Sequence, residues 1–329
     1  MRAVHRVLMV VSSLSVGLSA YADHCCGGGG FCPAPTMTLL VGFPAGGSTD
    51  AAARLLADSL GRTLSKTVIV VNRAGGGGLI AAGAAAAPGV GDGCTFLVAR
   101  KSTVVITRLA RSGSAVDPLR DLLPLVEFGE TPNVLLVHSG LGARGFEDLR
   151  RLAAGRQLSY ASTGAGTFGH LAGSLLSSTI RGQAMQHVPY QGGAPALTDL
   201  TTGSVQLGWF DIPSAMPHIK AGLLIPLIVT GNQRVPGLPN VPHAAEAGLP
   251  ALLTSDSLLL MSAIGPMSRH IGDVSSAVQR ALADPDVRRR LDDMSVRPVQ
   301  RSGDELKRRL DDEARGWELH AEQAGIRLR

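Results

Sequence analysis

The sequence is poor in aromatic residues and cysteines, and its charge is nearly balanced. Phe, Trp and Tyr make up 4% of the 329 residues, four residues are Cys, and the formal net charge is +5. Lys and Arg are scattered along the chain, whereas nucleic-acid-binding proteins gather them on one face. The one tight basic run, Arg288–Arg290, is followed by Asp292 and Asp293, as on a solvated helix face. We therefore expect no nucleic acid partner.

Common signatures of catalysis and nucleotide binding are also missing. The sequence has no G-x-S-x-G elbow, no H-E-x-x-H and no glycine loop ending in Gly-Lys-Ser/Thr. The run Gly164–Gly169 approaches the dinucleotide fingerprint, but no acidic residue stands at a strand end about 20 positions later. Ser162 and His170 could form a hydrolytic pair, yet no orienting carboxylate is evident. We expect no enzyme and no cofactor; a hydrolase or acyl-transfer enzyme is the alternative from another class.

The cysteines do not form a recognisable metal motif. Cys25, Cys26 and Cys32 crowd the segment "DHCCGGGGFCPAP", whose spacing matches no zinc site. We expect no metal and interpret residues 23–35 as a flexible leader with room for one local disulfide formed after export. Cys94, in the strand pattern "CTFLVA", is interpreted as a small buried apolar residue.

Long apolar runs are confined to the first 22 residues. Arg2 and Arg6 precede an apolar, serine-containing stretch that ends in Ala20-Tyr21-Ala22. This is the order of a secretory signal peptide, and the stretch is too short for a comfortable membrane span. We expect an exported protein whose signal, residues 1–22, is cleaved near Ala22.

The rest of the chain alternates between apolar strand patterns and helical patterns. Runs such as "TMTLLVGF", "TVIVVNR" and "CTFLVAR" are separated by alanine-rich helical segments, and a second set begins at "PNVLLVHS". This alternation predicts parallel sheets covered by helices on both faces. Residues 101–130 hold two prolines and are interpreted as a crossing segment.

The order of the patterns predicts two α/β domains. The tail from His270 is helical and has no strand of its own, so it most simply packs on the first unit. Domain 1 is then discontinuous, residues 36–133 plus 254–329, and domain 2 spans residues 134–253. The chain would cross near residues 131–137 and again near 251–260, which is a hinge arrangement around a cleft.

Glycine-rich loops between strands and helices are the main functional signal. In "FPAGGSTD", residues 43–50, the glycines leave the backbone open and a hydroxyl or Asp50 can cap the next helix. The first turn of a helix offers unpaired N–H groups and partial positive charge, which attract anions. The same order recurs at residues 72–80, 161–170 and 190–199. Two lobes facing each other would present several such cradles to one small carboxylate.

These motifs together resemble the Bug (TctC-like) family of solute-binding proteins. The resemblance rests on "FPAGGSTD…AARLLADSLG", "VIVVNRAGGGG", "YASTGAGTFGHLAG", "HVPYQGGAPALTDLTTGSVQLGWFD", "HIKAGLLIPLIVT" and "LPNVPHAAEAGLP", and covers the chain from about residue 36. Two features depart from the family pattern. Cys94 stands where the family commonly has an aromatic residue, and residues 101–116 lack the usual family sequence.

The resemblance implies a two-lobed α/β fold of the type II, Venus flytrap kind, with a central cleft and two crossing hinge strands. It implies a monomer in the periplasm that captures a small carboxylate for the permease of a tripartite tricarboxylate-type transporter. Di- and tricarboxylates, acidic amino acids and aromatic acids are the ligand classes it implies. The alternative is a ligand-sensing partner of a two-component histidine kinase.

We expect the ligand to be held by the glycine loops and nearby strand ends. Each choice has a structural alternative: Asp50 and Asp211 could cap helices, Phe43 could be core, and Tyr190 could pack at the hinge. His170 and His187 are interpreted as structural. The expected ligand-binding residues are Phe43, Ala45, Gly46, Gly47, Thr49, Asp50, Ser162, Thr163, Gly164, Gly166, Thr167, Tyr190, Gly192, Gly193 and Asp211.

Overall fold

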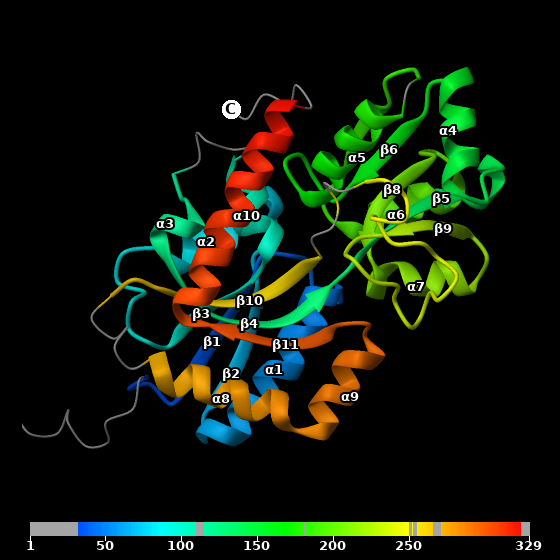
Figure 1. Cartoon of the computed structure of the whole chain (residues 1–329). Coiled ribbons are helices and arrows are strands. Elements are labelled where there is room, and N and C mark those ends of the chain that lie inside the picture. The colour runs from blue at the N-terminus through cyan, green and yellow to red at the C-terminus, as the bar shows by residue number, and fades with distance from the viewer. Residues whose placement is uncertain are drawn as a thin grey trace, which may run out of the picture. The chain divides into compact units, whose positions relative to one another are not determined.

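Two mixed β-sheets with helices packed on them form the fold (Figure 1). The computed structural model describes residues 32–109, 115–180, 182–249, 252, 255–265 and 271–323. Both sheets belong to one compact unit of the chain. Among the described residues, no helix has the length and apolarity needed to cross a membrane.

The first sheet has six strands in the order β11-β4-β10-β3-β1-β2. The strands β1, β2 and β3 are parallel, whereas β10 runs antiparallel to both β3 and β4, and β11 antiparallel to β4. Their bounds are β1 Thr36–Val41, β2 Thr67–Asn72, β3 Thr95–Arg100, β4 Leu122–Thr131, β10 Asp256–Ala263 and β11 Arg297–Ser302.

The second sheet has five strands in the order β7-β6-β8-β5-β9. Here β6 is parallel to β7 and β8, while β5 is antiparallel to β8 and β9. The bounds are β5 Asn133–His138, β6 Ser159–Ser162, β7 Gln186–Pro189, β8 Leu207–Asp211 and β9 Leu224–Val229.

Amphipathic helices cover the sheets. In α1, for example, Ala52, Ala53, Leu56 and Leu60 recur at helical spacing and are all buried. With the first sheet lie α1 Ser48–Leu64, α2 Leu79–Ala85, α3 Pro118–Asp121, α8 Ile271–Ala283, α9 Pro285–Asp293 and α10 Gly303–Gln323. With the second lie α4 Phe146–Gly155, α5 Phe168–Thr179, α6 Gly193–Thr202 and α7 Ile212–Lys220. Short helical turns occupy Gly76–Gly78 (η1), Thr103–Thr107 (η2) and Ser139–Leu141 (η4).

The expectation of parallel pairing is confirmed for β1, β2 and β3 and for β6, β7 and β8, but each sheet as a whole is mixed because antiparallel strands complete it. Two strands also lie where none was predicted. The segment interpreted as a crossing contains β4, and the tail interpreted as helical contains β11. The sequence "RPVQRS" of β11 is polar and only half-buried, so no alternating apolar pattern marks it. Its pairing with β4 defines it as a strand.

A disulfide joins Cys32 to Cys94. Cys94 is therefore not the unpaired apolar residue that its strand pattern suggested. Cys32 is buried, and the ammonium group of Lys66 donates hydrogen bonds to the carbonyls of Cys32 and Ala34. The chain is thus anchored in the fold from Cys32 onward. Cys25 and Cys26 lie outside the described residues.

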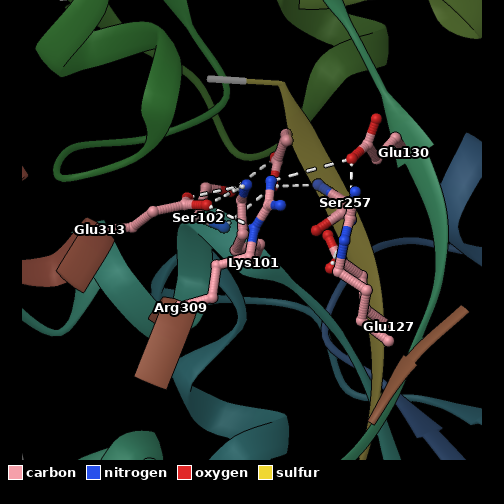
Figure 2. Close-up of polar contacts among 9 residues, drawn as sticks. Lys101, Ser102, Glu127, Glu130, Ser257, Arg309 and Glu313 are labelled. Carbon is pink, nitrogen blue, oxygen red and sulfur yellow. Dashed lines mark hydrogen bonds and ion pairs between the residues drawn. The ribbon is translucent and has the colours of Figure 1, made fainter. Parts of the chain in front are cut away.

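A buried ionic network connects α10 to the sheet beneath it (Figure 2). Lys101 Nζ lies 2.8 Å from Glu313 Oε2, and Arg309 bonds the same carboxylate. On the sheet, Glu127 is fully buried and accepts a hydrogen bond from Arg301. Burial opposes ionisation of Glu127, but the charges of Lys101 and Arg301 outweigh it and hold the pKa of Glu127 below its ordinary value.

The chain passes from the first sheet to the second through a single residue, Pro132. β4 ends at Thr131 and β5 begins at Asn133. The return to the first sheet lies between Val229 and Asp256. The two crossings lie side by side, because Asp256, where the chain re-enters the first sheet, pairs with Thr131, the last residue of β4 before Pro132. We call this pair of crossings the neck.

Candidate functional site

A cavity of about 760 Å³ is lined by residues of both sheets. The first sheet contributes the β1–α1 loop and Arg100 at the end of β3. The second contributes the turns that lead into α5 and α6 and the end of β8. Parallel strands bind ligands beyond their carboxyl ends, where these loops lie. The cavity is the candidate ligand site.

The N-termini of four helices border the cavity. Lining residues include Gly47, Ser48 and Thr49 at the start of α1, and Thr167 and Phe168 at the start of α5. Others are Gly193 and Ala194 in α6 and Pro213 and Ser214 in α7. The first amides of a helix have no carbonyl partner within it and carry partial positive charge. At α7 the Ile212 and Ser214 amides are already bonded and Pro213 has no N–H, so the backbone donors suited to an anion are those of α1, α5 and α6.

In the β1–α1 loop, the first turn of α1 borders the cavity while the Gly46 amide is already occupied. Gly46 has φ +81° and its N–H donates to Asp50 Oδ2 at 2.9 Å. Gly47 has an extended conformation and lines the cavity, with Phe43 and Ala45 beside it.

Asp50 does not line the cavity. Its carboxylate also accepts hydrogen bonds from Arg54 and Asn72. Burial raises the pKa of Asp50, but the bonds from Arg54, Gly46 and Asn72 outweigh it and hold that pKa below its ordinary value. Through these bonds Asp50 organises the loop.

The loop after β6 places two of its five predicted residues on the cavity. Thr163 and Thr167 line it, whereas Ser162, Gly164 and Gly166 do not. These three residues form hydrogen bonds within the loop and with α5. The Gly164 carbonyl accepts from the hydroxyls of Ser162 and Thr167, and the Gly166 amide donates to His170 Nδ1.

Two stacked histidines support this loop. The rings of His170 and His187 lie 4.0 Å apart between centroids, and His187 also stacks on Tyr160. His187 Nε2 is 2.7 Å from Ser162 Oγ. Burial lowers the pKa of both histidines, and the neighbouring His170 helps to lower the pKa of His187 to about 4. Both therefore hold the loop as neutral rings near pH 7.

In the turn into α6, too, only some of the predicted residues line the cavity. Gly193 lines the cavity, while Gly192, with φ +114°, approaches the ring of Pro44 from the other sheet. Tyr190 does not line the cavity. Its hydroxyl donates to Asp199, and burial together with that carboxylate raises the pKa of Tyr190 to about 12. Of the glycine run at residues 75–78, Gly77 alone lines the cavity.

Asp211 lines the cavity and also caps a helix. Its Oδ1 accepts a hydrogen bond from the amide of Ser214 in the first turn of α7. Both roles expected for it, cap and cavity residue, are therefore present together.

The sequence pattern missed a charged group of the cavity, Arg100. Its side chain is 7% exposed, and its Nε donates to Asp256 Oδ2 at 2.9 Å. Asp256 also accepts bonds from the amide and hydroxyl of Ser102 and from the Ser257 amide. Burial lowers the pKa of Arg100, but the charges of Asp256 and Asp211 raise it above its ordinary value. The guanidinium is held as a cation at the carboxyl end of β3.

Other missed residues come from the strands themselves. Asn133, Trp209 and Phe210 line the cavity, as do Ser102 and Asp256. Phe168 packs edge-on against Trp209 and against Trp317 of α10, which lies with the other sheet. Arg100 is the last residue of the apolar strand β3, a position at which a charged side chain is usually solvated, and the aromatic residues looked like ordinary core. Among the described residues, no three His, Cys, Asp or Glu side chains gather as metal ligands.

Comparison with known proteins shows to which family the chain belongs. Residues 52–326 match the model of the tripartite tricarboxylate transporter family receptor, TctC. The chain belongs to the TctC family. These receptors are periplasmic solute-binding proteins, and the two-lobed fold is that of their solved structures.

Relatives of this TctC-family chain match almost end to end. Protein BugT of Bordetella pertussis is 30% identical over 300 residues, covering 90% of this chain and 91% of BugT. The structure of R. palustris Rpa4515 with adipate is 31% identical, with a TM-score of 0.82, covering 88% of this chain and 97% of that one. MatC of Rhodopseudomonas palustris with bound malate is 28% identical, with a TM-score of 0.77, covering 87% and 98%.

Proposed function

We propose that this protein captures a small carboxylate in the cavity between its two sheets. The observation that carries the proposal is the convergence of the N-termini of α1, α5 and α6 and the buried Arg100 on one cavity. Oriented amides and one fixed cation stabilise a carboxylate without a cofactor. The adipate and malate in two similar structures support the same ligand class.

The biological setting of the proposal follows from the family. The ligand bridges both sheets, favours their closure about the neck at Pro132, and is handed to membrane subunits of a tripartite transporter. The chain acts as a monomer after its N-terminal signal is removed near Ala22. The disulfide between Cys32 and Cys94 supports export to an oxidising compartment.

The proposal is tested by calorimetry on the mature protein with adipate, malate, benzoate and L-glutamate. We expect saturable binding of at least one of them, and a higher melting temperature in its presence. A protein that binds no carboxylate at millimolar concentration would contradict the proposal.

A matched pair of glycine variants locates the binding. A Cβ added at Gly47 meets only the Pro44 carbonyl, at 3.4 Å, so Gly47→Val fits the backbone but fills cavity space. Gly145→Val is the control, because Gly145 is also an extended N-cap glycine, at α4, and does not line the cavity. Overpacking by about 1–3 kcal/mol predicts a roughly five- to 150-fold loss of affinity for Gly47→Val. Equal affinity in the two variants would place the site elsewhere.

A further inference from the structure

The charged groups of the cavity form an unusual set for a receptor of dicarboxylates. Among the described residues that line it, Arg100, Asp211 and Asp256 are the ionised side chains besides any charge on His218, giving one positive and two negative charges. Lys101 adds nothing to this set, because its ammonium group is directed to Glu313 on α10 (Figure 2). A dicarboxylate would bring two further negative charges into this space.

Both carboxylate oxygens of Asp256 already accept hydrogen bonds from groups of the protein. Its Oδ2 accepts from Arg100 Nε and Ser102 Oγ, and its Oδ1 accepts from the amides of Ser102 and Ser257. It fixes the orientation of the guanidinium and has no further role toward a ligand. The charges left to meet a ligand are those of Arg100 and Asp211.

Arg100 and Asp211 face each other across the two sheets as a loose ion pair with no hydrogen bond between them. Nη1 of Arg100 lies 3.9 Å from Oδ2 of Asp211, beyond hydrogen-bond distance. No hydrogen bond from Nη1 or Nη2 of Arg100 is present among the described residues, and Asp211 uses only Oδ1, for the Ser214 amide. Free donors and a free charged acceptor therefore lie side by side at the cavity.

We infer that Arg100 and Asp211 together recognise a carboxylate with an ammonium group on the adjacent carbon, so that the ligand class is an α-amino acid. This inference rests on the proposed function and sharpens it. The guanidinium takes the carboxylate, and Asp211 Oδ2 takes the ammonium. A plain carboxylate satisfies Arg100 but faces Asp211 with like charge, whereas the amino acid leaves the net charge of the cavity unchanged. The pair is the specificity-determining element of the site.

The test compares ligands that differ only in the group beside the carboxylate. Calorimetry on the mature protein uses L-glutamate, 2-hydroxyglutarate and glutarate, and in parallel L-phenylalanine, phenyllactate and 3-phenylpropionate. A hydrogen bond between charged groups predicts that, in at least one series, the amino acid binds at least about tenfold more tightly than the compound without the amino group. The hydroxy acid falls between them.

The variant Asp211→Asn tests the negative charge of Asp211, because it removes that charge and keeps the size of the side chain. Asparagine caps a helix as well as aspartate does, so the α7 cap is kept. We expect the preference for the amino acid to fall at least about tenfold while the compound without the amino group binds equally or more tightly. The control is Asp284→Asn, which changes the capping residue of α9 outside the cavity and leaves both affinities unchanged.

Three results would overturn the inference. One is a preference for glutarate or 3-phenylpropionate over its amino acid in the wild type. Another is an unchanged preference in Asp211→Asn. The third is binding of adipate or malate with no binding of either amino acid, in which case the proposed function stands and the assignment of Asp211 falls. If no carboxylate of any kind binds, both fall together.

Discussion

Arg100 is positioned before any ligand arrives. Its Nε is bonded to Asp256, and both side chains are almost fully buried. A cation that is already oriented loses little conformational freedom when a carboxylate binds, so more of the interaction contributes to affinity. The same burial makes Arg100 a poor position for substitution, because its removal leaves Asp256 charged and unpaired.

At the scale of single residues, the sequence indicated the glycine and hydroxyl positions that line the cavity better than it indicated the charged ones. Gly47, Gly193 and Thr167 were predicted because glycines and hydroxyls at a strand–helix junction have a direct physical use. Asp50 lies outside the cavity lining, and the sequence did not reveal its partners Arg54 and Asn72, because they become neighbours only through the helix and the sheet.

Arg100 was missed for a similar reason. A charged residue at the end of a strand is usually solvated, and only the contact with Asp256, 156 residues later, shows that it is buried.

The stacked histidines make stability depend on pH. The pKa of His187 is lowered to about 4 in the folded state, below the ordinary value of about 6.5 for an unfolded chain. Between these values the unfolded state binds more protons, so the free energy of unfolding falls as the pH is lowered. We expect urea unfolding at pH 5 to need less denaturant than at pH 7.5.

The variant His187→Gln should reduce that difference, because its amide can still bond Ser162 but does not titrate. Both proteins also lose unfolding free energy in acid because their carboxylates become protonated. This shared loss is the baseline against which the contribution of the histidine is measured. Identical midpoint shifts in wild type and variant would show that the histidine pair does not contribute.

At the scale of elements, β3 carries a distinct feature at each end. Cys94 immediately precedes it and is bonded to Cys32, while Arg100 ends it at the cavity. The helices and most strands of this region were predictable, because helical and alternating apolar periods are local. Strand direction is not local, so the sequence did not indicate that β10 runs antiparallel to its neighbours. The polar edge strand β11 was not expected at all.

Removal of the disulfide should destabilise the fold without weakening the site. The bond spans 62 residues, and loop closure of this length in the unfolded chain accounts for at most about 4 kcal/mol. We expect Cys94→Ser to lower the free energy of unfolding by about 2–4 kcal/mol. Ligand affinity, measured well below the melting temperature, should be unchanged.

The variant Cys32→Ser is the partner control, and it should match Cys94→Ser in stability. A large loss of affinity in either variant would mean that the order of the chain at Cys32 is transmitted along β3 to Arg100.

At the scale of the whole molecule, one hydrophobic cluster includes residues of both sheets, and several specific contacts join them. Phe168 of α5 meets Trp317 of α10 at 5.8 Å between ring centroids, Gly192 approaches Pro44, and Arg100 approaches Asp211. The sequence predicted two lobes and the place of the first crossing. It could not predict these contacts, because they join residues that lie in different domains of the expected scheme.

Trp317→Leu should weaken closure. An aromatic pair contributes about 0.5–1.5 kcal/mol beyond its buried area, which predicts a roughly two- to tenfold loss of ligand affinity. We also expect a larger radius of gyration for the ligand-free variant in small-angle scattering.

Leu306→Ala in the same helix is the control for lost stability. Leu306 is fully buried in α10, and its truncation should cost about 2–5 kcal/mol of folding free energy while leaving affinity and radius of gyration unchanged. Equal effects of both variants on affinity would mean that the Trp317 contact does not govern closure.

The single-residue crossing at Pro132 can serve as a pivot between the two sheets. Proline fixes one of its two backbone rotations, and the pairing of Asp256 with Thr131 places the returning chain beside it. Rotation about such a pivot moves the outermost loops much farther than the floor of the site. The separation of those outer loops would therefore report whether the site is occupied, at a distance from the bound compound and whatever its identity.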